Sequence, residues 1–75
     1  MSSLPNWSVD EHTRPEEAVK MAMERERLAR EFYFHCAGIV KDPGVRKMFE
    51  FLAGEEGRHF ALLEQEYDRF ISGEN

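Results

Sequence analysis

The 75-residue chain has one cysteine, Cys36, and therefore no internal disulfide. A lone free thiol is typical of a reducing compartment, so we expect a cytoplasmic protein. No apolar run approaches the roughly 20 residues that a transmembrane helix requires. Residues 1–12 also lack the hydrophobic segment of a secretory signal peptide. The sequence predicts neither a membrane protein nor a fold stabilised by disulfides.

Basic residues are outnumbered by acidic ones, 10 to 15, which gives the chain a net charge of −5. This balance would repel a polyanion, so nucleic acid is not an expected partner. So short a chain buries a small core, which is usually marginal without a disulfide, a metal or a partner subunit. Because disulfides are excluded, we expect metal binding and self-association to stabilise the fold.

Proline and glycine are absent from residues 16–37, and their positions on either side mark the expected ends of a first helix. Thr13 followed by Glu16 matches a capping box, with Pro15 in the first turn of the helix. This pattern predicts a first helix that ends near Ile39, with Gly38 as its C-cap.

A second helix is expected after the connection. Asp42 suits its N-cap and Pro43 its first position, and Ser72-Gly73 should stop it after Ile71. Two helices of similar length with a short connection favour an antiparallel hairpin. The sequence therefore predicts an all-α fold.

The hairpin domain should comprise residues 13–72. The preceding residues 1–12 have no sustained periodicity and include Pro5 and Asn6. We expect them to form a flexible N-terminal arm, anchored by Trp7.

Each expected helix carries two apolar stripes, which lie roughly 140° apart on the wheel of the first helix. In that helix the stripes are Val19, Ala22, Ala29, Tyr33, Ala37 and Val40, and Met21, Leu28, Phe32 and Ile39. In the second helix they are Val45, Phe49, Leu52, Leu63 and Phe70, and Met48, Phe51 and Leu62. One neighbouring helix cannot cover both stripes. We therefore expect the hairpin to dimerise into a ferritin-like four-helix bundle, or to form a larger homo-oligomer.

Three polar residues occupy positions where the stripes predict core side chains. Glu26 falls in the series 19, 22, 26, 29, 33, and Glu56 and His59 fall in the series 45, 49, 52, 56, 59, 63. An unpaired buried carboxylate is costly unless it becomes protonated. A shared metal ion would explain all three residues.

The heights of these residues support the metal interpretation. Glu26 and Glu56 are equally far in sequence from Lys41, in the connection, so an antiparallel hairpin places them at one level. His59 lies one turn beyond Glu56 on the same face. Two hairpins related by a two-fold axis would supply four carboxylates and two imidazoles, the ligand set of di-iron carboxylate bundles. Iron suits these ligands, and manganese or zinc are alternatives.

Tyr33 projects on the Glu26 face and is a candidate catalytic residue beside the three ligands. It would donate a hydrogen bond to the site or act as a redox-active neighbour; the alternative is an ordinary core tyrosine. Glu31 and His35 point away from Glu26, so we expect neither to bind the metal.

The stretches ERLAREFY (26–33), KDP (41–43) and LAGEEGRH (52–59) resemble the first helix pair of rubrerythrins, over roughly residues 16–70. The resemblance implies iron ligation by Glu26 and by the Glu-x-x-His pair. A full rubrerythrin repeats the helix pair and usually adds a rubredoxin domain with paired Cys-x-x-Cys motifs. These 75 residues contain neither, and their single pair is more similar to the encapsulated ferritins, whose site assembles between two hairpin subunits.

The similarity to encapsulated ferritins implies a ferroxidase that oxidises Fe(II) with O₂, with the product stored in an encapsulin shell. A rubrerythrin-like peroxide reductase that uses an external electron donor is the alternative enzyme. The remaining alternative is a metal-binding assembly module without turnover.

Overall fold

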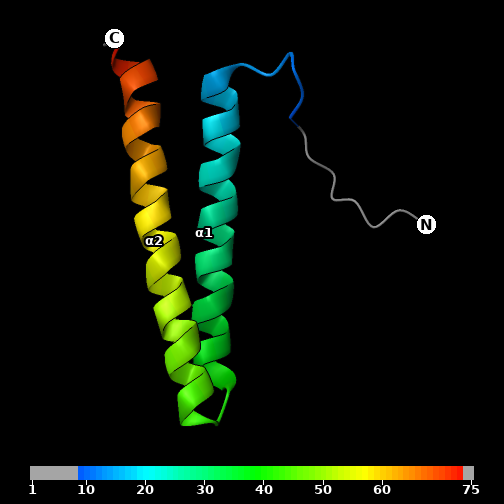
Figure 1. The fold of residues 1–75 in the computed structure, drawn as a ribbon, viewed down its shortest axis with the longest axis vertical. Coiled ribbons are helices and arrows are strands. Elements are labelled where there is room, and N and C mark those ends of the chain that lie inside the picture. Colours follow the sequence, from blue (N-terminus) through cyan, green and yellow to red (C-terminus); the bar gives the residue numbers. More distant parts are fainter. Residues whose placement is uncertain (1–8, 74–75) are drawn as a thin grey trace, which may run out of the picture.

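The computed structural model describes residues 9–73, which form two helices joined by a short connection (Figure 1). Helix α1 spans Pro15–Ile39 and α2 spans Pro43–Ser72, and the two run antiparallel, side by side. The smallest dimension of the structure, 12 Å, is about the diameter of one helix. The predicted all-α hairpin is therefore confirmed, and it is a single layer.

The described residues include no helix that is apolar over enough of its length to cross a membrane. Trp7 and the other residues of 1–8 lie outside the described residues, as do residues 74–75. The flexible arm therefore stays a prediction.

The predicted N-terminus of α1 is wrong by one residue. Its N-cap is Arg14, whose backbone N–H donates to Oε1 of Glu17 at 3.3 Å. Thr13 belongs instead to a turn with Asp10: its N–H donates to the Asp10 carbonyl, and its Oγ1 accepts from the Asp10 N–H. The Thr13 hydroxyl cannot cap α1 because the preceding turn uses it.

Gly38 is likewise not the C-cap that the sequence predicts. Helix α1 continues through Ile39, and the cap is Val40, whose N–H still donates to the Cys36 carbonyl at 3.0 Å. Val40 has an extended backbone, with φ −66° and ψ 143°. A chain that leaves the helix in this conformation requires no left-handed residue, so glycine has no advantage there.

Both ends of α2 agree with the sequence. The Asp42 side chain accepts a hydrogen bond from the Val45 N–H at 2.9 Å. Pro43 occupies the first turn, where a backbone N–H would have no partner within the helix, so its missing N–H costs nothing. Gly73 ends the helix in the left-handed conformation, with φ 75°.

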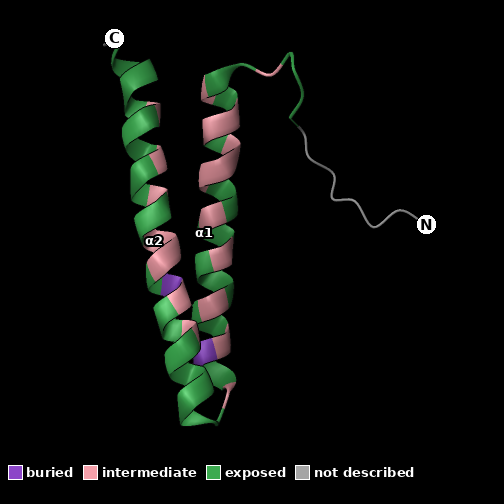
Figure 2. Ribbon diagram, viewed as in Figure 1, coloured by how far each residue is buried: buried purple, intermediate pink, exposed green. Residues whose placement is uncertain are grey.

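The first apolar stripe of α1 faces α2, as its periodicity predicts. All of its members are buried or half-buried, but Ala37 and Ala53 are the only residues classed as buried in the described part of the chain (Figure 2). Two small side chains allow the helices to approach, but they make a very small core. The hairpin by itself therefore lacks the buried apolar surface of a stable domain.

Most members of the second stripes remain exposed, although Met21 is half-buried. Leu28, Phe32, Ile39, Phe51 and Leu62 each have more than half of their surface in solvent. The expectation that the hairpin cannot cover both stripes of each helix is thus confirmed.

Candidate metal centre

Glu26 on α1 and Glu56 and His59 on α2 form the cluster in which a metal could bind. One ligand atom from each residue lies within 4.8 Å of the others. Nδ1 of His59 is 3.5 Å from Oε1 of Glu26 and 3.4 Å from Oε1 of Glu56. The hairpin register thus brings together the three residues that the sequence analysis selects.

Burial of the two carboxylates fits a cation at this point. The side chains of Glu26 and Glu56 are 27% and 18% exposed. Oε1 of Glu26 is buried and has no hydrogen-bond partner among the described residues. A buried acceptor without a partner costs about 1–3 kcal/mol. A bound cation would satisfy this oxygen, so the donor set fits an iron, manganese or zinc ion.

One side of the cluster is open. The side chain of His59 is 52% exposed, although it occupies a position in the apolar series of α2. Three ligands also fall short of the six that a two-metal carboxylate bundle provides. The hairpin therefore presents half of such a ligand set at its surface.

The Tyr33 ring, a member of the first stripe of α1, packs against two other aromatic rings. Its ring stacks on Phe49, with centroids 6.1 Å apart, and meets the edge of Phe32 at 5.8 Å. Within residues 9–73, the Tyr33 hydroxyl makes no hydrogen bond to the cluster. The packing agrees with the alternative of a core tyrosine, and the catalytic role stays a prediction.

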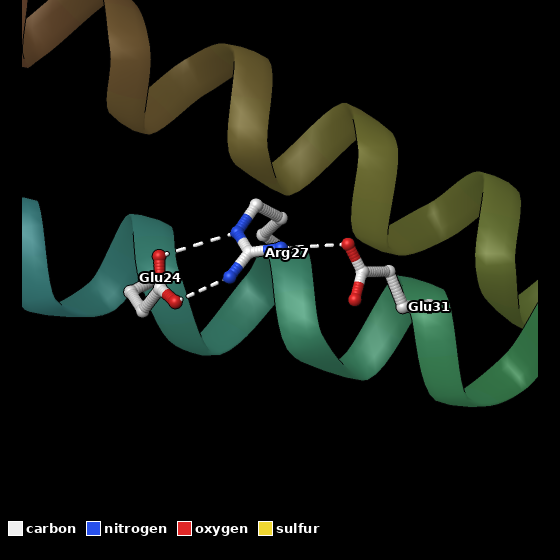
Figure 3. A network of polar contacts seen from close by, with 3 residues as sticks. All are labelled: Glu24, Arg27 and Glu31. Carbon is white, nitrogen blue, oxygen red and sulfur yellow. Dashed lines mark hydrogen bonds and ion pairs between the residues drawn. The ribbon is translucent and has the colours of Figure 1, made fainter.

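The acidic residues near the cluster have other partners. Glu55 pairs with Arg58, and Arg27 bridges Glu24 and Glu31 along the exposed side of α1 (Figure 3). The hydrogen bond from Arg27, together with its charge, lowers the pKa of Glu24. These carboxylates are therefore engaged in ion pairs along their own helices.

A cavity that the sequence did not predict lies beside the cluster. Its volume is about 360 Å³, and its lining includes Arg27, Arg30, Gly57 and Phe60. A Cβ atom on Gly57 would lie 3.5 Å from Nε of Arg30, an ordinary van der Waals distance, so the Arg30 side chain packs over Gly57 without requiring a glycine there. Three of the four residues directly follow a cluster residue in sequence, which turns them about 100° round their helices. This one-residue offset from the predicted ligands is the sequence signal that could have located these three lining residues.

The family model named Rubrerythrin matches residues 5–75, which include both helices and all three cluster residues. The chain belongs to the rubrerythrin family. Comparison with curated proteins and with solved structures found no significant match. Rubrerythrins usually bind iron and are often oxidoreductases, which agrees with the chemistry of the cluster. The closer similarity to encapsulated ferritins stays a prediction.

Proposed function

We propose that two copies of this rubrerythrin-family chain form a di-iron site that oxidises Fe(II) with O₂. The observation that carries the proposal is the buried, unpartnered Oε1 of Glu26, 3.5 Å from Nδ1 of His59 and beside Glu56. Membership of the rubrerythrin family supports iron as the metal. In this proposal iron is both the metal that the site binds and the substrate that is oxidised.

The protein's own residues hold and shield the metal. Glu26 and Glu56 would hold the iron through their carboxylates, and His59 would hold it through a neutral ring nitrogen. Bound Fe(II) supplies the electrons that reduce O₂. Four carboxylates from two chains balance the charge of two divalent ions, so the ions can be held inside an apolar bundle.

A second chain completes the site. The exposed ring of His59 and the uncovered apolar side chains support a homodimer in which the two clusters face each other. The cytoplasmic location and a surrounding encapsulin shell remain predictions within this proposal.

Adding Fe(II) to the protein in air tests the activity. A ferroxidase consumes O₂ and develops ferric absorbance over several turnovers, whereas a metal-binding module without turnover binds iron and stops. We expect Glu56→Ala to abolish turnover and Glu55→Ala to retain it, because Glu55 pairs with Arg58 outside the cluster. Full turnover in Glu56→Ala would contradict the proposal.

Family membership also supports a second candidate, reduction of peroxide with electrons from an external donor. Fe(II)-loaded protein would then consume hydrogen peroxide faster than O₂, and an added reductant would sustain turnover. Measuring both oxidants with the same preparation separates the two activities.

A further inference from the structure

The cavity beside the metal cluster lies on the opposite face of the hairpin from His59. Around α2, His59 is roughly 60° from Glu56 in one direction. Phe60 and Gly57, which line the cavity, are roughly 40° and 100° from Glu56 in the other direction. A partner chain that covers the exposed ring of His59 therefore leaves the cavity open to solvent. Its volume of about 360 Å³ is within the range of small-molecule sites.

Arg30 reaches across the cavity from α1 to α2. Its Nε would lie 3.5 Å from a Cβ atom on Gly57, on the opposite helix. Its guanidinium carbon lies 5.1 Å from the centre of the Phe34 ring, one turn further along α1, where the ring face attracts a cation. Contacts on two sides restrict the side chain, which lowers the entropy lost when the guanidinium binds a ligand.

The two arginines that line the cavity differ in their partners. Arg27 donates hydrogen bonds from all three of its guanidinium nitrogens, to Glu24 and Glu31 (Figure 3). Among residues 9–73, Arg30 forms no ion pair and donates no hydrogen bond. The cavity therefore presents one guanidinium to which no carboxylate is bound.

A guanidinium in this state favours an anionic ligand. Its planar fork of N–H groups matches the two oxygens of a carboxylate or a phosphate. The cavity is far larger than a bare phosphate, and Phe60 lines it with an apolar side chain. The chain is also net −5, so a singly charged ligand is repelled less than a doubly charged one. These features together favour a carboxylate with an apolar body.

We propose that this cavity binds a small organic carboxylate, held by the guanidinium of Arg30, with its apolar body against Phe60. Arg30 is one turn along α1 from Glu26, and Gly57 directly follows Glu56. The bound molecule therefore lies next to the metal ligands without coordinating the metal. It occupies the outer face of the hairpin, where a second chain on the His59 side does not displace it.

Titration of benzoate into the full chain, followed by NMR at constant ionic strength, tests this inference. Zinc fills the metal cluster in this experiment because it is diamagnetic. We expect the amide resonance of Gly57 and the Nε–H resonance of Arg30 to shift as benzoate binds. Benzamide has the same shape without the charge, so it should bind at least about tenfold more weakly.

Replacement of the arginine separates its role from that of other exposed arginines. We expect Arg30→Gln to weaken benzoate binding at least about tenfold, because the charged fork is lost. Arg69→Gln is the matched control, since Arg69 also lies 5.1 Å from the centre of a phenylalanine ring, that of Phe70, but does not line the cavity. This variant should keep the wild-type affinity, and circular dichroism should show that both variants keep their helices.

Several outcomes would overturn the carboxylate site. They are absence of benzoate binding to the wild type, equal affinity of the wild type and Arg30→Gln, and equal affinity for benzoate and benzamide. Inorganic phosphate bound as tightly as benzoate would contradict the apolar body. If Arg30→Gln loses its helices, the wild-type shifts decide: shifts centred on His59 would place the carboxylate on the metal and overturn the proposal.

Discussion

Nδ1 of His59 lies 3.5 Å from Oε1 of Glu26, on the opposite helix, and that oxygen is buried without a hydrogen-bond partner. The pair links the two helices through polar atoms at a level where the stripes would otherwise place apolar side chains. We therefore expect Glu26 to destabilise the metal-free protein and to stabilise the metal-bound one.

Glu26→Gln should separate these two effects. Without metal, replacing the buried carboxylate by a neutral amide removes a desolvation penalty, and we expect stability to rise by about 1 kcal/mol. With metal, the lost ligand should abolish most of the stabilisation that iron or zinc provides. Thermal unfolding with a chelator and with added metal, at one protein concentration, measures both. A variant that gains as much stability from metal as the wild type would contradict the assignment.

Helix spacing should control the cluster. Ala53 is fully buried between α1 and α2, so Ala53→Leu forces the helices apart and should destabilise the protein by about 1–3 kcal/mol. Because Glu26 and Glu56 then separate, metal affinity should fall at least tenfold. Ala61→Leu, on the exposed side of α2, is the control and should change neither quantity. Calorimetric metal titration and urea unfolding provide the two measurements.

The start of α2 depends on the Asp42 side chain. Asp42→Ala removes the acceptor of the Val45 N–H and should lower the free energy of unfolding by about 1 kcal/mol. Asp68→Ala, an exposed aspartate within α2, has no capping role and should have a much smaller effect. Equal losses in the two variants would show that the cap does not stabilise α2.

The carboxyl of Glu24 should titrate differently once Arg27 is removed. The hydrogen bond and charge of Arg27 lower the pKa of Glu24, so Arg27→Gln should raise that pKa toward its ordinary value. A lowered folded-state pKa stabilises the protein above the unfolded-state pKa, and the contribution is lost as pH falls through the folded value. The residue is exposed, so we expect little change in overall stability. Carbon-detected NMR titration of the glutamate carboxyls measures the shift.

Much of the hairpin could be read from local patterns. Asp42-Pro43 and Gly73 mark the ends of α2 because capping depends on neighbouring residues alone. The ends of α1 were harder to predict from the sequence. Thr13 has a competing partner in Asp10, which the capping-box pattern does not reveal.

The sequence by itself determined the two helices, their antiparallel order and the register that places Glu26 level with Glu56, because helical periodicity and a short connection fix these features. Only the tertiary structure decided which atoms are buried. The orphaned Glu26 oxygen, the half-exposed His59 and the Arg30 side chain over Gly57 depend on how closely the two helices pack. That separation is set by side-chain volumes across the interface, and no pattern within one helix encodes it.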